Sequence, residues 1–216
     1  MYKLVIFDLD GTILNTIEDL KDSANFALSQ RGYPQKNLEE IRSFVGNGIR
    51  NLIIRCLPEN TDEAIIDELF TIFNARYKEH CMDKTCPYDG VLELLAKLRE
   101  QGIATAVLSN KADYAVKILC DKYFTGLFDA CAGMKEDVRR KPWPDGIYNI
   151  LSELNVKGEN AVYIGDSEVD IKTAKAAGID CIAVDWGFRD REVLEAEGAN
   201  HIASNMEELL KEILND

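Results

Sequence analysis

Acidic side chains follow two apolar segments of this sequence, an arrangement that suits phosphoryl chemistry. The β-rich run 3–7 ends directly at Asp8, and Asp10 follows two positions later. A second apolar run, residues 161–164, leads through one glycine to Asp166. Carboxylates that cluster are unfavourable unless a cation lies between them, and Mg²⁺ prefers such oxygen ligands. The pattern therefore predicts a magnesium site that contains Asp8 and Asp166.

The carboxylate of Asp8 is the predicted nucleophile. A carboxylate held in line with phosphorus can form an aspartyl-phosphate when a metal ion shields its charge. Asp10 is then placed to protonate the leaving oxygen and afterwards to activate water. Gly11 lets the loop turn closely around a phosphate group, and Thr12 offers a hydroxyl donor. The segment thus predicts a nucleophile, an acid/base and part of a phosphate cradle.

A phosphate site in this chain has to supply its own positive charge, because the formal net charge is −13. Lys141 stands in a Lys-Pro-Trp-Pro motif at the expected start of a helix and provides one fixed positive charge. Ser109 and Asn110 follow the apolar run 103–108, so we expect them at a strand end. The predicted phosphate-binding residues are Gly11, Thr12, Ser109, Asn110 and Lys141.

Apolar strand-like segments and helical patterns alternate along most of the chain. Besides the runs that precede the polar residues, β-rich segments occur at 128–132 and 181–184. Near-continuous apolar strands are typical of a parallel sheet covered on both faces. Apolar residues at helical spacing lie between them, for example in 91–98, 147–154 and 171–178. The order predicts an α/β protein with a three-layer, Rossmann-like parallel sheet, whose carboxyl edge gathers the polar residues.

Residues 15–87 interrupt this alternation. The stretch has no convincing strand and contains four amphipathic helical segments, at 17–30, 38–45, 49–57 and 64–77. We therefore expect two domains, an α/β core of residues 1–14 and 88–216 and an inserted all-helical lobe of residues 15–87. Because Asp8 lies just before the insertion, the lobe is expected to cover the site.

The ordered motifs D-x-D-G-T, a strand-end serine, K-P-x-P and G-D-x-x-x-D resemble those of the haloacid dehalogenase superfamily. The resemblance covers essentially the whole chain apart from the insertion, which is itself similar to the helical cap of that family. It implies that Asp8 is both nucleophile and Mg²⁺ ligand. It also implies that Asp10 is the acid/base and that its main-chain carbonyl binds the metal.

The same resemblance extends to four further residues. It implies that Ser109 and Lys141 hold phosphate, that Asp166 completes the metal site, and that Asp170 orients Lys141 or a metal water. Phosphatases and phosphomutases of the superfamily keep an acid at the place of Asp10, whereas members resembling dehalogenases or phosphonatases lack it. The expected enzyme is therefore a phosphoric monoester hydrolase that transfers the phosphoryl group to water.

Substrate specificity is expected to come from the helical lobe, because the core residues contact only phosphate. The turn Gly46-Asn47-Gly48 could approach a ligand closely, and Arg50 could bind a carboxylate. The alternative is a plain helix–helix turn with a solvated Arg50. This turn and the segment 86–90 resemble the phosphoglycolate phosphatases, so the expected substrate is 2-phosphoglycolate.

Other functions stay open on the same residues. A phosphomutase of the β-phosphoglucomutase type shares the core and Asp10, and pyrophosphate and sugar phosphates are alternative substrates. A phospho-accepting receiver domain also uses acids and a lysine on an α/β sheet. Its phosphorylated aspartate, however, follows a middle strand, and it has no large helical insertion. No G-x-x-x-x-G-K loop is present, and neither His80 nor His201 lies in a catalytic motif.

The composition and the apolar runs of the sequence predict whether the protein enters a membrane and which partners it binds. No apolar run approaches the roughly 18 residues that a membrane span needs, and residues 1–3 lead into a strand rather than a signal peptide. The acidic charge argues against nucleic acid and anionic membranes as partners. We expect a small phosphorylated metabolite as the partner and a monomer or homodimer.

The cysteines predict a reducing, cytoplasmic location. There are six, and they form no C-x-x-C pair. They are Cys56, Cys81, Cys86, Cys120, Cys131 and Cys181. Those at 56, 120, 131 and 181 lie in apolar runs, so we expect buried, reduced thiols there.

Overall fold

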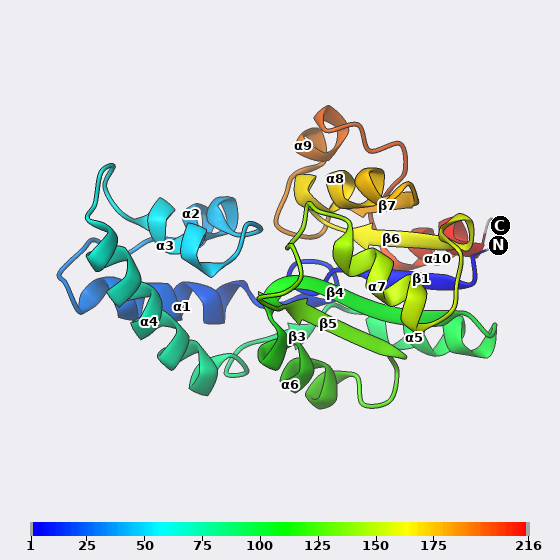
Figure 1. The fold of residues 1–216 in the computed structure, drawn as a ribbon, viewed down its shortest axis with the longest axis horizontal. Helices are drawn as coiled ribbons and strands as arrows, with labels where there is room; N and C mark the ends of the chain where they lie inside the picture. Colours follow the sequence, from blue (N-terminus) through cyan, green and yellow to red (C-terminus); the bar gives the residue numbers. More distant parts are fainter. Residues whose placement is uncertain (1, 215–216) are drawn as a thin grey trace. The chain divides into compact units, whose positions relative to one another are not determined.

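The protein forms two compact units in a computed structural model that describes residues 2–214. One unit combines Met1–Leu14 with Pro87–Asp216, and the other is Asn15–Cys86. The first is an α/β unit and the second is helical (Figure 1). The helical unit is thus an insertion between the first strand of the sheet and the rest of the α/β unit.

A parallel six-stranded sheet forms the centre of the α/β unit. Its strands lie in the order β5-β4-β1-β6-β7-β8, and each neighbouring pair is parallel. The strands are β1 (Leu4–Phe7), β4 (Ala104–Ala112), β5 (Ala130–Met134), β6 (Ala161–Gly165), β7 (Asp180–Val184) and β8 (Ile202–Ala203). All four residues of β1 are fully buried, as expected for a strand covered on both faces. The predicted α/β class with a parallel sheet is confirmed.

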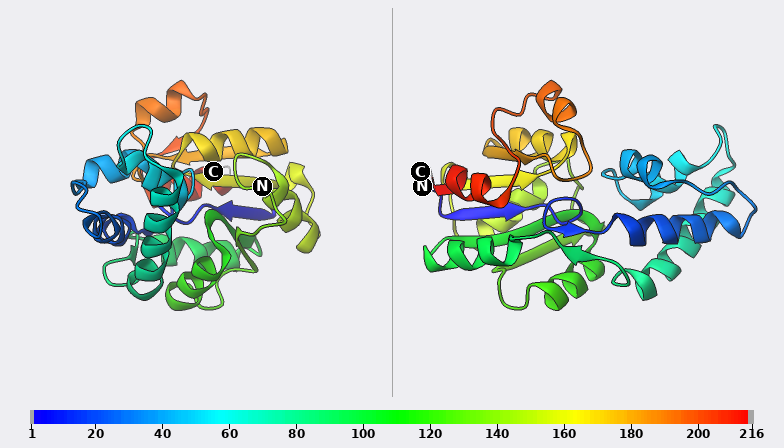
Figure 2. Two further views of the ribbon diagram at one scale, coloured as in Figure 1. Left: turned by 60° about the vertical axis from the view of Figure 1, so that its left-hand side comes forward. Right: turned by 180° about the vertical axis from the view of Figure 1, so that it is seen from behind.

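Helices cover both faces of this sheet and produce three layers (Figures 1 and 2). They are α5 (Val91–Glu100), α6 (Asp113–Tyr123), α7 (Asp145–Glu153), α8 (Glu168–Ala177), α9 (Arg191–Ala196) and α10 (Met206–Leu214), with a short 3₁₀ helix at Gly158–Asn160. Helix α7 contacts α8 on one face, and α5 contacts α10 on the other. Ile147 and Ile150 of α7 pack in one apolar cluster with Leu4, Ile6 and Tyr163 of the sheet.

The helical unit contains the four helices that hydrophobic spacing predicts. They are α1 (Ile17–Ser29), α2 (Leu38–Phe44), α3 (Ile49–Cys56) and α4 (Glu63–His80). The buried Asp19 carboxylate of α1 accepts hydrogen bonds from the main-chain N–H groups of Lys84 and Thr85 and from the Thr85 hydroxyl. This carboxylate therefore ties the first helix of the insertion to its last residues.

Several short elements have no counterpart in the sequence patterns. β2 (Leu14–Asn15) and β3 (Cys86–Pro87) form a two-stranded sheet of their own.

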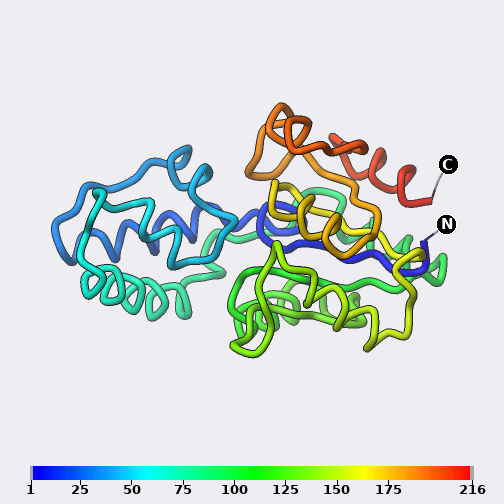
Figure 3. Tube along the Cα trace, turned by 45° about the horizontal axis from the view of Figure 1, so that its top comes forward, coloured from blue at the N-terminus to red at the C-terminus, as the bar shows by residue number. Residues whose placement is uncertain are grey.

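β1 begins and α10 ends at the same end of the α/β unit (Figure 3). Across residues 2–214, no helix combines the length and the apolar character that a bilayer crossing requires.

The six cysteines are free thiols in the structure. Cys56 and Cys120 are buried, as their apolar surroundings predict. Cys131 and Cys181 are only partly buried, so the prediction of buried thiols was wrong for these two. Cys131 lies on the edge strand β5, and Cys181 lies near the amino end of β7, where a strand has less cover than at the sheet centre.

The substitution Ile147→Ala should lower the free energy of unfolding by about 2–5 kcal/mol, because it removes fully buried methyl groups between α7 and the sheet and leaves a cavity. Urea unfolding followed by circular dichroism measures the loss. The matched control is Ile118→Ala on α6, where the side chain is 40% exposed and the change should stay within about 1 kcal/mol. Equal losses in both variants would contradict this placement of the core.

Candidate active site

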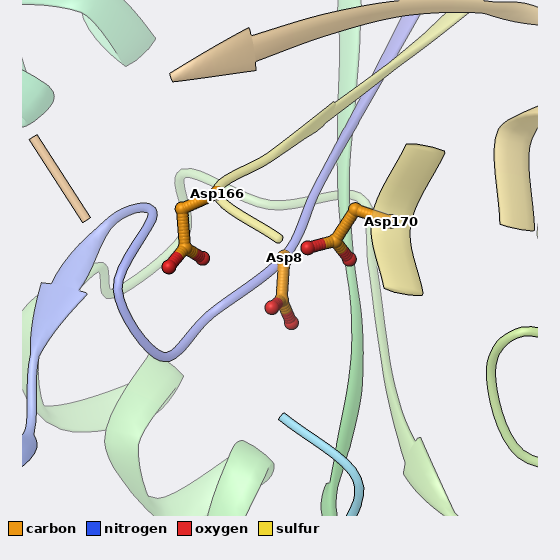
Figure 4. Close-up of side chains that lie close together, drawn as sticks. All are labelled: Asp8, Asp166 and Asp170. Atoms are coloured by element: carbon orange, nitrogen blue, oxygen red, sulfur yellow. The ribbon is translucent and has the colours of Figure 1, made fainter. Parts of the chain in front are cut away.

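Three buried carboxylates converge at the carboxyl end of the two central strands. Asp8 follows β1, Asp166 follows β6, and Asp170 lies in the first turn of α8 (Figure 4). One carboxylate oxygen from each lies within 4.8 Å of the others. β1 pairs directly with β6, Phe7 opposite Ile164, so the residues that follow both strands emerge side by side. The structure therefore brings together the three acids that the motifs single out.

The ammonium group of Lys141 lies among these acids. Its Nζ is 2.8 Å from Asp8 Oδ1 and 2.7 Å from Asp170 Oδ1, and the lysine side chain is only 4% exposed. One ammonium faces three carboxylates, so two negative charges stay uncompensated when all three are ionised. A single divalent cation would balance that deficit.

Burial and mutual repulsion both oppose ionisation of the acids. Burial raises the pKa of Asp8 to about 7 in spite of the adjacent Lys141, and Asp170 and Asp10 add repulsion. Burial, with repulsion from Asp170 and Asp8, raises the pKa of Asp166 to about 8. The pKa of Lys141 lies well above its usual range, because Asp170 and Asp8 favour the charged form more than burial opposes it. Below about pH 7, Asp8 and Asp166 therefore retain protons in the metal-free protein, and a bound cation would displace them.

The cluster has donors of the kind that Mg²⁺ selects. Asp8 and Asp166 offer carboxylate oxygens, the ligands that this hard ion prefers. Asp8 Oδ1 is buried and has the Lys141 ion pair as its contact, without a well-directed hydrogen bond. A Cβ atom added at Gly11 would lie 2.3 Å from Asp166 Oδ2, so only glycine lets this loop come so close. These residues would hold the ion.

Two donors fix the Asp166 carboxylate. The Thr12 hydroxyl donates to Oδ1 at 2.9 Å, and the main-chain N–H of Phe188 donates to Oδ2 at 2.7 Å. Trp186 Nε1 donates in turn to the Thr12 carbonyl at 3.0 Å. The Thr12 hydroxyl is thus used by a carboxylate here, and its contact with phosphate stays a prediction. Sequence patterns missed the Phe188 N–H, because a main-chain donor has no residue signature.

Ser109 and Asn110 lie inside a strand, so the prediction that they follow the strand end was wrong. β4 continues to Ala112, although its pairing register with β5 shifts between Leu108 and Ala112. Such an irregularity redirects side chains without ending the strand. The Asn110 side chain donates to the Lys141 carbonyl at 3.0 Å and so holds the backbone of the lysine against β4.

Lys111 is a buried charge that the sequence motifs did not single out. Its Nζ lies 2.7 Å and 2.9 Å from the two carboxylate oxygens of Asp10, and its side chain is only 3% exposed. Buried lysines are rare unless they are paired. The available signal was a lysine directly after Ser109 and Asn110 in a strongly acidic chain. The ion pair holds the predicted acid/base in place.

The predicted specificity residues lie in the helical unit. Gly46 and Gly48 both have positive φ, 117° and 82°, a conformation that favours glycine. The Asn51 side chain donates to the Asn47 carbonyl at 2.8 Å. Arg50 of α3 forms ion pairs with two acids of α4, Glu63 and Asp67. A contact between any of these residues and substrate stays a prediction.

The fold and the acidic site define a hydrolase of a known family. A family model described as haloacid dehalogenase-like hydrolase matches residues 5–184. The chain belongs to that family, as its motifs predict.

Three similar proteins refine this relationship. A phosphoglycolate phosphatase of Mesorhizobium japonicum is 35% identical over 198 residues, which cover 90% of this chain and 87% of the relative. One of Pseudomonas syringae pv. tomato is 31% identical over 214 residues, which cover 96% and 78%. A crystal structure from Lactobacillus delbrueckii subsp. bulgaricus, provisionally assigned as a phosphoglycolate phosphatase, matches with a TM-score of 0.96 at 36% identity and covers 100% and 99% of the two chains.

The raised pKa values predict that metal-free protein loses stability as the pH rises. In the unfolded chain Asp8 and Asp166 titrate near pH 4, so between about pH 4 and pH 8 the folded state binds more protons than the unfolded state. Their stabilising contribution is complete below pH 4 and is lost as the pH passes about 7 to 8. In chelator, Tm should therefore fall as the pH rises from about 4 to about 8.

Thermal unfolding with Mg²⁺ provides the second arm of this measurement. The ion should raise Tm more at the higher pH, where it no longer has to displace protons. The exposed control Glu59→Gln should retain the wild-type pH dependence, whereas Asp166→Asn should weaken it. A flat Tm across this pH range in chelator would show that the acids are not held in the protonated form.

Proposed function

We propose that this protein is a Mg²⁺-dependent phosphatase that hydrolyses 2-phosphoglycolate, a small phosphomonoester, through an aspartyl-phosphate on Asp8. The observation that carries the proposal is the buried Asp8 carboxylate, 2.8 Å from Lys141 and beside Asp166 at the carboxyl edge of a parallel sheet. Relatives named phosphoglycolate phosphatase, which match 90% or more of this chain, support the choice of substrate. The free thiols support a reducing, cytoplasmic location.

In the first step, an Asp8 oxygen attacks phosphorus while the P–O bond to the organic group breaks. The bond electrons go to the leaving oxygen, which takes a proton from the Asp10 carboxyl group. Lys141 and Ser109, both buried at the same edge of the sheet, hold the phosphoryl oxygens. Asp8, the Asp10 carbonyl and Asp166 would hold Mg²⁺, which would supply charge neutralisation there.

In the second step, water attacks the phosphorus of the aspartyl-phosphate. The water gives a proton to the Asp10 carboxylate, and the Asp8 carboxylate leaves with the electrons of the broken P–O bond. The ion pair with Lys111 keeps Asp10 within reach of both oxygens. Asp170 accepts from Lys141 at 2.7 Å and keeps the ammonium beside the nucleophile.

Phosphate release from a panel of esters tests the function. With Mg²⁺ present, release should be fastest from 2-phosphoglycolate, compared with pyrophosphate, β-glucose 1-phosphate and an aryl phosphate, and it should stop in chelator. Asp8→Asn should lower kcat by about 10³-fold or more, because the amide replaces the nucleophile at nearly constant shape.

The exposed acid Asp180 provides the matched control for this experiment. It accepts a hydrogen bond from the Tyr2 hydroxyl, and Asp180→Asn should leave kcat unchanged. Faster release from another ester would discard the substrate and keep the mechanism. Wild-type turnover in folded Asp8→Asn would exclude a covalent step on Asp8, and turnover in chelator would exclude the metal requirement.

We also propose that the Gly46-Asn47-Gly48 turn and Arg50 bind the carboxylate of the substrate. A guanidinium matches a carboxylate in two-point geometry. Arg50→Ala should raise KM for 2-phosphoglycolate about tenfold and leave KM for an aryl phosphate unchanged, a difference of about 1.4 kcal/mol in binding. The control is Arg31→Ala, which also removes an arginine paired with an acid of α4, Glu68. Equal KM changes for both substrates would assign Arg50 to packing of α3 on α4.

A further inference from the structure

The phenol of Tyr163 is a polar group in the middle of the apolar sheet. Tyr163 lies on β6 and is fully buried, between Ile6 of β1 and Cys181 of β7. A buried hydroxyl is unfavourable unless it is hydrogen-bonded. The hydroxyl of Tyr163 has two partners, since it accepts from Lys141 Nζ at 2.9 Å and donates to the Leu108 carbonyl at 3.0 Å.

These contacts complete the surroundings of the Lys141 ammonium. An ammonium group carries three N–H donors. Lys141 Nζ donates to Asp170 at 2.7 Å and to Tyr163 at 2.9 Å, and it forms an ion pair with Asp8 at 2.8 Å without a well-directed hydrogen bond. Two partners are acids, whereas the phenol stays neutral because burial raises the pKa of Tyr163 well above its usual range. The phenol thus directs the ammonium without adding negative charge to an already acidic cluster.

We infer that Tyr163 is a positioning residue that sets the Lys141 ammonium against Ser109 to form the phosphate site. One side of its hydroxyl is bonded to Lys141, and the other is bonded to the carbonyl of Leu108, the residue directly before Ser109. The Asn110 side chain holds the main chain of the lysine, so the phenol is the neutral group that acts on the charged end. The inference rests on the proposed function in taking Lys141 and Ser109 as the phosphate ligands.

Loss of the hydroxyl should leave the ammonium to the two acids alone. The ammonium lies off the hydroxyl end of the ring, since Nζ is 2.9 Å from the phenol oxygen and 5.5 Å from the ring centroid, and phenylalanine would keep the packing of the ring in the sheet. In Tyr163→Phe the charge should therefore shift toward Asp8 and Asp170 and away from a bound phosphate. We expect the affinity for phosphate to fall about tenfold, the scale of one hydrogen bond to a charged group.

Inorganic phosphate is the probe for this test. Its Kd is measured by titration calorimetry with saturating Mg²⁺, and KM and kcat are measured with the best ester of the panel. Tyr163→Phe should raise the phosphate Kd and KM about tenfold each, lower kcat less than about threefold, and leave the Mg²⁺ Kd unchanged. The matched control is Tyr148→Phe on α7, an exposed tyrosine whose hydroxyl contacts the Ala176 carbonyl at 3.4 Å. It should leave all four constants unchanged.

The two affinities separate a positioning role from a purely structural one. A structural role would weaken Mg²⁺ and phosphate together, and this result would overturn the inference. An unchanged phosphate Kd in Tyr163→Phe would overturn it as well, as would a wild-type protein that binds no phosphate. If wild-type protein binds phosphate but hydrolyses no ester, the proposed function fails, and the phosphate Kd of Tyr163→Phe still decides the role of Tyr163.

Discussion

The Lys141 ammonium lies 2.8 Å from Asp8 and 2.7 Å from Asp170, almost without solvent. Buried charges are stable only when partners compensate them, and removal of one partner leaves an unpaired charge in a dry site. The surrounding backbone therefore has to hold each partner at a fixed place. Parallel pairing of β1 with β6 delivers Asp8 and the loop that carries Asp166, and the first turn of α8 delivers Asp170.

Close main-chain approach is the second requirement of this cluster. At Gly187, as at Gly11, an added Cβ would lie 2.3 Å from an atom of Asp166. These two loops enclose the carboxylate, and the Phe188 N–H and Thr12 hydroxyl complete its hydrogen bonds. An acid with its oxygens held in this way is preorganised, so binding of a cation needs little rearrangement of the loops.

Sequence patterns predicted the parallel α/β sheet and the helices of the insertion because burial leaves a periodic trace in residue type. They also identified Asp8 and Asp166, since an acid directly after an apolar strand is unusual. The two-residue strands β2, β3 and β8 are too short to show any period. The continuation of β4 through Ser109 depends on a register shift, which residue type does not encode. Lys111 and Tyr163 were missed because their roles follow from contacts with residues distant in sequence.

The Asp19 carboxylate binds residues 84 and 85, so a side chain of the first helix of the insertion holds the last residues of the insertion. The entropic cost of closing a loop grows slowly with loop length, and here a local contact helps to bring the two ends together. The chain leaves the α/β unit after β1 and returns to it after the insertion, and the two ends of the insertion are held near each other. Changes in the helices between those ends can therefore leave the register of β1 with β4 and β6 unchanged.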